Sequence, residues 1–197
     1  MKPSSVSLTL TSYNRADYLK EALESVLNQT LTDFTLILYD DGSTDNSLEV
    51  AQNYAKQDKR IKVFSGKNLG TPRHLKHAFE LAINDNPDVS YMGWMDSDDK
   101  LAPTALEETK AILDSFPAVG MVYTDYLDMT PDGILLGKGY RCKKPYSKNR
   151  LLIEFMTFHF RMMRREVYQQ SGGIDLRAIC AEDYDLCLKI SEITEIY

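Results

Sequence analysis

The chain has few of the residues that mark secreted, zinc-binding or nucleic-acid-binding proteins. It contains only three cysteines, Cys142, Cys180 and Cys187, and their spacing fits neither a disulfide framework nor a metal site. We therefore expect free thiols in a reducing compartment. Basic residues are in deficit as well, with 23 Lys and Arg against 29 Asp and Glu and a formal net charge of −6 at pH 7. Because the chain has no strongly basic run, we expect no nucleic-acid partner.

Long apolar runs are also missing. None reaches the roughly 18 residues that a membrane-spanning helix requires. The N-terminal stretch MKPSSVSLTLTSYNR is too polar for a signal peptide. We expect a cytoplasmic protein and leave peripheral attachment to a membrane open. With 197 residues, 43% of them hydrophobic and 26% charged, the chain has the composition of one globular domain.

The sequence does contain a regular alternation of strand and helix patterns. Apolar runs predict strands, and segments with apolar residues at helical spacing follow the first four of them, the first beginning near Asp17 with Asn14 as its N-cap. The predicted strands cover residues 5–11, 34–40, 60–65, 89–95 and 118–124. Such alternation predicts an α/β fold with a mostly parallel central sheet flanked by helices.

After residue 124 the alternation gives way to a mixed pattern. The sequence predicts a hairpin arm near residues 131–140 and a helix over 147–156. A strand near 158–165 and a final helix over 182–193 follow. No linker or repeat separates this part from the rest, so we expect a single domain over residues 1–197.

Three polar clusters follow the first, second and fourth predicted strands: TSYNR (11–15), DDGSTD (40–45) and DSDDK (96–100). Parallel α/β sheets bind ligands beyond the carboxyl ends of their strands, so we expect these clusters to meet on one edge of the sheet. Asp96 and Asp98 could together hold Mg²⁺ or Mn²⁺, which carboxylates and phosphate oxygens bind. The alternative is a solvated turn leading into the next helix.

The other two clusters carry groups suited to a nucleotide. Asp41 could accept hydrogen bonds from a ribose hydroxyl or a base, or could belong to a turn that caps the next helix. The loop from Thr11 to Arg15 offers backbone amides, the ring of Tyr13 and the charge of Arg15. Arg73 lies at the start of a helix, where anions are favoured, and could contact phosphate or pair with an acid.

In the second part of the chain, the segment CAEDYDLCL is the strongest candidate for catalysis. Its acids, Glu182, Asp183 and Asp185, could form an acidic first helical turn, or one of them could be a general base. His159 lies between two phenylalanines, which favours a structural role over ligation. We expect His74 and His77 on a helix surface. Arg161, Arg164 and Arg165 could help to hold a diphosphate or could be solvated.

Four ordered segments resemble family 2 glycosyltransferases, and together they cover about residues 5–190. SLTLTSYNRADYLKEALESVLNQTLTDFTLILYDDGSTDNS resembles the opening of that family, and KNLGTPRH resembles its N-x-G-x-x-x-A-R segment. MDSDD matches the D-x-D motif, and GGIDLRAICAEDYDLCLKI resembles G-G-F-D…E-D-x-D-L. The resemblance implies a GT-A (Rossmann-like) fold with a nucleotide-binding half, 1–100, and a smaller mixed acceptor-side half, 101–197.

The same resemblance implies a metal-dependent, inverting transfer of a sugar from a nucleotide-diphospho-sugar, most often a UDP-sugar. The acceptor would be a hydroxyl of a saccharide, a lipid-linked molecule or a protein, in polysaccharide or glycoconjugate biosynthesis. Thr11, Tyr13 and Asp41 would hold the nucleoside. Asp98 would bind Mn²⁺ or Mg²⁺, and Asp96 would reach the ribose or that metal. Asp183 would be the base that takes the proton of the acceptor.

The chain departs from the family pattern at two places. The NLGTPRH loop is shorter than the corresponding segment of the family, so the resemblance does not fix the role of Arg73. The chain stops at Tyr197, soon after Asp183, so we expect either a truncated chain or a minimal enzyme with an open site. A non-catalytic module that binds nucleotide-sugars is the alternative function. A receiver domain of the signalling type is disfavoured because its acidic pair should follow the first strand.

Overall fold

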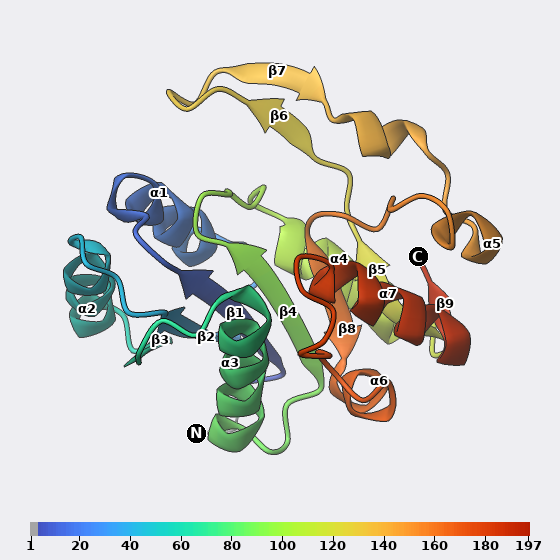
Figure 1. Ribbon diagram of the computed structural model, residues 1–197, viewed down its shortest axis with the longest axis horizontal. Coiled ribbons are helices and arrows are strands. Elements are labelled where there is room, and N and C mark those ends of the chain that lie inside the picture. The colour runs from blue at the N-terminus through green and yellow to red at the C-terminus, as the bar shows by residue number, and fades with distance from the viewer. Residues whose placement is uncertain (1–3) are drawn as a thin grey trace.

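A seven-stranded sheet with helices on both faces forms the body of the protein (Figure 1). The computed structural model describes residues 4–197; residues 1–3, which begin the stretch where we see no signal peptide, lie outside it. The strands, in the order in which they lie in the sheet, are β3 (Ile61–Ser65), β2 (Phe34–Asp40), β1 (Val6–Ser12), β4 (Tyr91–Asp96), β8 (Arg161–Arg164), β5 (Val119–Tyr123) and β9 (Glu195–Ile196). The predicted mostly parallel α/β fold is confirmed.

The sheet is parallel from β3 to β4, and β8 then runs antiparallel to both β4 and β5. The first five strands begin and end within two residues of their predicted bounds. The insertion of β8 between β4 and β5 brings the second part of the chain directly beside the strand that carries the DSDD motif.

Each face of the sheet has its own apolar core. One face is covered by α1 (Ala16–Leu27), α2 (Ser47–Gln57) and α4 (Ala105–Ser115), with Leu23, Ala51 and Leu106 fully buried. The other is covered by α3 (Thr71–Asp85), α6 (Arg165–Gln170) and α7 (Glu182–Ile193), with Phe79 and Leu186 buried. Burial on both faces explains why the central strands are almost continuously apolar.

The start of α1 differs from the prediction and shows how two of the polar clusters are joined. Arg15, not Asn14, is the N-cap residue. Asn14 adopts a left-handed conformation (φ 51°), and its side-chain oxygen accepts a hydrogen bond of 2.8 Å from the backbone of Thr44. In return, Ser47 and Asp45 accept hydrogen bonds from the backbone of Arg15 and Ala16. The loop after β2 therefore caps the helix after β1, which fixes the two loops side by side.

The predicted hairpin stands away from the sheet at the top of Figure 1. It consists of β6 (Leu127–Met129) and β7 (Leu135–Lys138) and is followed by a 3₁₀ turn, η1 (Tyr140–Lys143). The predicted helix over 147–156 is wrong in length, since α5 covers only Lys148–Leu151. Residues 152–160 are turns and irregular backbone that lead into β8.

Candidate active site at the carboxyl edge of the sheet

The register of the strands brings the three polar clusters to one edge, as the sequence predicts. Thr11 on β1 is paired with Asp96, the last residue of β4, and Ser12 is paired with Asp40, the last residue of β2. Each loop that follows therefore begins at the same level of the sheet. Tyr13 lies in the first of these loops and is exposed.

Asp41 directly follows β2 at this edge, and both of its carboxylate oxygens have partners within the protein. Only 1% of the residue is exposed. Its oxygens accept hydrogen bonds from the backbone of Leu69 (2.8 Å) and Gly70 (3.1 Å), and the second oxygen lies 2.9 Å from Nδ1 of His74. The prediction that His74 lies on a helix surface is wrong, because this contact buries it. Asp41 thus shapes the loop before α3.

The acidic cluster after β4 divides into two groups. Asp98 forms an ion pair of 3.2 Å with Nε of Arg15, and both side chains are close to half exposed. Asp96, Asp99 and His159 form the second group, in which one ligand atom from each lies within 4.8 Å of the others. His159 Nδ1 and Asp99 Oδ2 are 3.5 Å apart. Two carboxylates and an imidazole at this spacing are a donor set suited to a divalent transition metal.

The charges around this second group disfavour its ionised forms. Burial, followed by the charges of Asp96 and Asp98, raises the pKa of Asp99 to about 7, although Arg161 opposes the shift. Desolvation, followed by the charge of Asp98, raises the pKa of Asp96, although Arg161 opposes the shift and the residue is in part exposed. Burial, followed by the charge of Arg161, lowers the pKa of His159 to about 4. His159 is therefore neutral near pH 7, which is the form that ligates metals.

Asp183 faces this group from the first turn of α7. Its carboxylate forms an ion pair of 3.1 Å with Nη2 of Arg161, which is buried on β8. Arg161 is paired in the sheet with Trp94, two residues before Asp96, and the charge of Asp183 contributes to raising the pKa of Asp96. Glu182 is buried, and Asp185 pairs with Lys189 at 2.6 Å. Of the three acids in the predicted helical turn, Asp183 is the one that pairs with Arg161.

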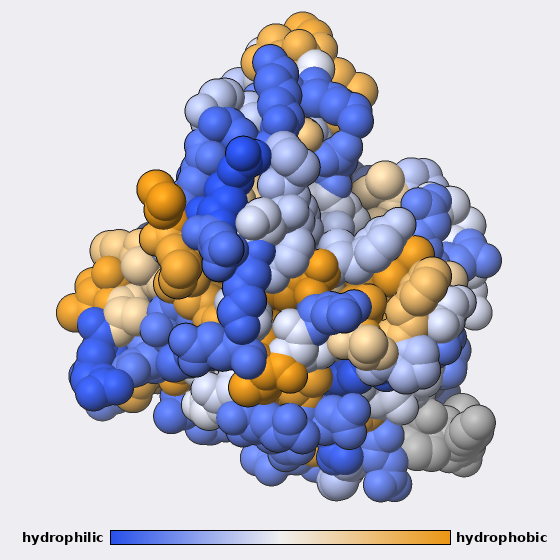
Figure 2. Space-filling model, turned by 90° about the vertical axis from the view of Figure 1, so that its right-hand side faces the viewer, coloured by the Kyte–Doolittle hydropathy of each residue, from blue (hydrophilic) through white to orange (hydrophobic). Residues whose placement is uncertain are grey.

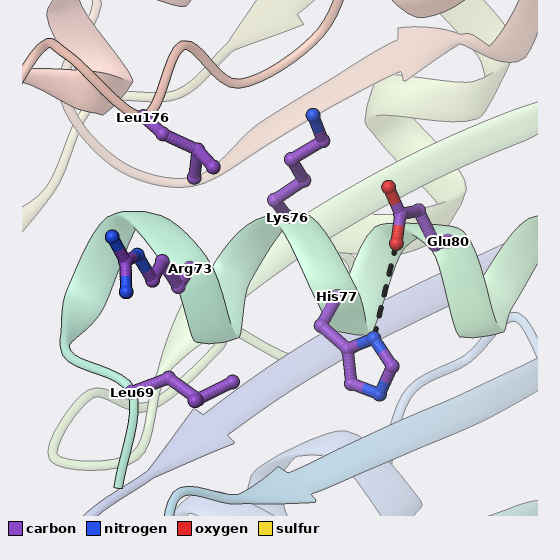
Figure 3. A pocket seen from close by; sticks show the side chains of 6 residues that line it. All are labelled: Leu69, Arg73, Lys76, His77, Glu80 and Leu176. Atoms are coloured by element: carbon purple, nitrogen blue, oxygen red, sulfur yellow. Dashed lines mark ion pairs between the residues drawn. The ribbon is translucent and has the colours of Figure 1, made fainter.

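Arg73 lies apart from the acidic groups, on the flank of α3 (Figure 3). It lines an open hollow of about 300 Å³ together with Leu69, Lys76, His77, Glu80 and Leu176. Leu176 belongs to the loop that leads to α7, so the hollow lies between that loop and α3. Arg15 and Asp98 are thus together, while Arg73 is not in contact with them.

Three residues of the site could not be assigned from the sequence: Asp99, His159 and Arg161. The sequence favoured a structural role for His159. It left open whether Arg161 contacts a diphosphate or is solvated. Arg161 is instead buried, and its guanidinium lies 4.8 Å from the centre of the Trp94 ring. The missing signal is the placement of β8 beside β4, which brings the residues around position 160 to the acidic cluster.

Comparison with known proteins shows the family of the chain. The family model Glycosyl transferase family 2 matches residues 7–172. The chain is 34% identical over 191 residues to chondroitin synthase of Escherichia coli, covering 95% of the chain and 26% of that protein. It is 32% identical over 188 residues to hyaluronan synthase of Pasteurella multocida, covering 95% of the chain and 19% of that protein. The chain thus spans about a quarter and about a fifth of the length of these two relatives.

Solved structures support the fold. Staphylococcus aureus TarS (residues 1–349) in complex with UDP-GlcNAc has a TM-score of 0.76 at 19% identity, covering 98% of this chain and 55% of that one. The mannosyltransferase PcManGT from Pyrobaculum calidifontis in complex with GDP-Man and Mn²⁺ has a TM-score of 0.74 at 17% identity, covering 98% and 54%. The expected GT-A architecture is confirmed. On the match of its sequence to the family model over most of its length, the chain belongs to glycosyl transferase family 2.

Proposed function

We propose that the chain transfers a sugar from a nucleotide-diphospho-sugar to a hydroxyl acceptor. The observation that carries this proposal is the meeting of Asp96, Asp99 and His159 at the carboxyl edge of the sheet, with Asp183 facing them from α7. An anion-neutralising site and a separate carboxylate are the two parts that displacement at a sugar carbon requires.

The donor would lie across the ends of β1, β2 and β4. Thr11, Tyr13 and Asp41 are the residues we assign to the nucleoside, with Asp41 acting through the loop and the histidine that it holds. Arg15 and Arg73 are the cations we assign to the diphosphate, and Arg73 would have to turn out of its hollow to reach it. We propose UDP as the nucleotide from the family resemblance, and the TarS complex with UDP-GlcNAc supports it.

The residues present fit a divalent metal. Asp96, Asp99 and His159 would hold Mn²⁺ or Mg²⁺, and Asp98 would join them once the diphosphate draws Arg15 away from it. The imidazole favours Mn²⁺, because Mg²⁺ prefers an all-oxygen shell. When bound, the cation neutralises the charge that develops on the leaving diphosphate.

Asp183 would be the general base. It takes the proton from the acceptor hydroxyl, whose oxygen attacks the anomeric carbon on the face opposite the departing diphosphate, so the configuration is inverted. Arg161 holds the carboxylate in one orientation through the 3.1 Å ion pair. The synthases among its relatives support a role in polysaccharide or glycoconjugate biosynthesis, and the three free cysteines support a cytoplasmic site.

The test is a thermal-shift screen of nucleotide-sugars with and without Mn²⁺, followed by a transfer assay with the donor that binds. A ligand that binds only the folded state raises the melting temperature. We expect UDP-sugars to raise it more with Mn²⁺ than without. If no nucleotide-sugar binds with the metal present, the proposal is wrong. Binding with neither transfer nor slow hydrolysis of the donor would instead identify a non-catalytic binding module.

A further inference from the structure

The segment that returns from the hairpin to the sheet is rich in basic residues. Residues 140–153, which we call the return segment, contain five Lys and Arg residues and no Asp or Glu. The chain as a whole has a formal net charge of −6. The return segment is therefore a local surplus of positive charge on an acidic protein, and the proposed site does not use it.

Two of its five cations are engaged within the protein. Lys144 forms an ion pair of 2.6 Å with Glu154, and the guanidinium of Arg141 lies 3.9 Å from the centre of the Phe158 ring. The other three, Lys143, Lys148 and Arg150, are exposed and form no ion pair within residues 4–197. Their charges face solvent and are available to an anionic partner.

Large apolar side chains lie among these free cations. Tyr140 is 64% exposed, Leu152 69% and Ile153 88%. Leu151, by contrast, is buried, and its carbonyl accepts a hydrogen bond from the Tyr184 hydroxyl on α7. Leu151 thus packs against the body, while the next two residues extend their side chains into water.

Figure 1 shows that β7, η1 and α5 follow the outer edge of the molecule from its top to its right-hand side. In Figure 2 the hairpin again forms the top of the molecule, and apolar surface gathers at its outer end. Leu135 and Leu136 of β7 are 62% and 66% exposed. The hairpin also carries the acids Asp128 and Asp132, so an anionic partner would contact the return segment first.

We propose that the return segment is a docking surface for an anionic lipid bilayer. Aliphatic side chains that enter the interface, flanked by lysines and arginines that reach the headgroups, are the chemistry of peripheral membrane attachment. Long basic side chains place their methylene stems against the apolar layer and keep their charges at its surface. An anionic glycan would satisfy Lys148 and Arg150 but would leave Leu152 and Ile153 in water, so lipid accounts for both observations.

This surface lies beside the proposed chemistry but does not depend on it. The bond between Tyr184 and Leu151 joins the return segment to the first turn of α7, which carries Asp183. A bilayer bound here would hold the acceptor side of the site close to the lipid headgroups. Failure of sugar transfer would leave the docking proposal intact, and loss of docking would leave nucleotide binding intact.

The test is flotation of the purified chain with vesicles of phosphatidylcholine alone and with about one third phosphatidylglycerol. We expect binding to the anionic vesicles only, weakened by salt. Lys148→Gln/Arg150→Gln should weaken it by at least about tenfold, since each cation near the surface contributes appreciably. Ile153→Ser should also weaken it. Matched controls are Lys56→Gln/Lys59→Gln on the distant helix α2 and the adjoining loop, and Ile179→Ser, whose isoleucine is 74% exposed elsewhere.

Folding of each variant is checked by its melting temperature. No binding to anionic vesicles, or an equal loss in the control variants, overturns the proposal. Dextran sulfate, a soluble polyanion, distinguishes a surface that binds polyanions from one that binds lipid. If Ile153→Ser binds vesicles normally while the Lys148/Arg150 variant loses vesicles and dextran sulfate alike, the surface binds polyanions rather than lipid and the proposal is wrong.

Discussion

Arg161 and Asp183 are joined by an ion pair of 3.1 Å that links β8 to the first turn of α7. The two partners differ in exposure: 3% of the Arg161 side chain is exposed, against 31% of that of Asp183. The buried guanidinium is fixed by a hydrogen bond to the carbonyl of Thr157 and by the ring of Trp94. The exposed edge of the carboxylate is therefore presented in one orientation toward the site.

Removing this guanidinium should affect turnover more than donor binding. In Arg161→Gln, Asp183 loses its partner, and we expect kcat to fall while the donor KM changes little. Stability should fall by about 1–3 kcal/mol, since a charged hydrogen bond to a partly exposed partner is lost. Arg164→Gln is the matched control, because Arg164 lies on the same strand and donates hydrogen bonds to the backbone carbonyls of Leu113, Phe116 and Val119. It should lose similar stability but keep its kcat per folded molecule.

Asp183→Asn should separate binding from chemistry. An amide cannot accept the acceptor's proton, so transfer should fall by about 10²–10⁴-fold, while UDP binding measured by calorimetry stays near that of the unmodified chain. Asp185→Asn is the control, since Asp185 pairs with Lys189 on the same helix. Full transfer by the Asp183 variant would assign the base to another residue.

The sequence predicted the parts of the site that depend on local pattern. Apolar runs that end in polar clusters placed Thr11, Asp41 and Asp96 at strand ends, and the parallel alternation placed those ends on one edge. Each of these inferences needs only neighbouring residues and the known geometry of βα units.

The parts that failed depend on contacts between distant segments. Asn14 is not the helix cap because groups some thirty residues away, Asp45 and Ser47, cap the helix instead. His74 is buried because Asp41, on another strand, lies against it. His159 joins the acidic cluster only because β8 enters the sheet beside β4. No periodicity within a segment encodes such pairings.

Metal affinity should distinguish the two acidic groups. His159→Ala should weaken Mn²⁺ binding by the ligand-free chain at least about tenfold, because changes even outside the ligand shell cost this much. Asp98→Asn should leave that affinity within about twofold, because Asp98 is paired with Arg15 in the ligand-free chain. The same variant should bind UDP more weakly in the presence of Mn²⁺. Free Mn²⁺ measured by electron paramagnetic resonance reports the first effect. His77→Ala, on the surface of α3, is the control, and unchanged affinity in His159→Ala would remove that residue from the metal site.

The pH dependence of Mn²⁺ binding should follow Asp99. Its pKa is raised to about 7, so below that pH a proton competes with the metal for the carboxylate. The pKa of His159 is lowered to about 4, so this ring is already free of its proton. Affinity should therefore rise between about pH 6 and pH 8 and then level off. Asp99→Asn should bind more weakly and lose this rise, and a midpoint near pH 4 in the unmodified chain would contradict the assignment.

Arg15 and Arg73 should differ in their effect on the diphosphate. The ion pair of Arg15 with Asp98 is about half exposed, so Arg15→Gln should change the free energy of unfolding by less than about 1 kcal/mol. A charged contact to phosphate contributes more, and UDP binding should weaken by about tenfold or more while uridine binding is unchanged. Arg73→Gln should show the same selectivity only if its side chain leaves the hollow beside Leu176. Calorimetry with UDP and uridine measures both, and equal UDP affinity in Arg73→Gln would restrict the diphosphate contact to Arg15.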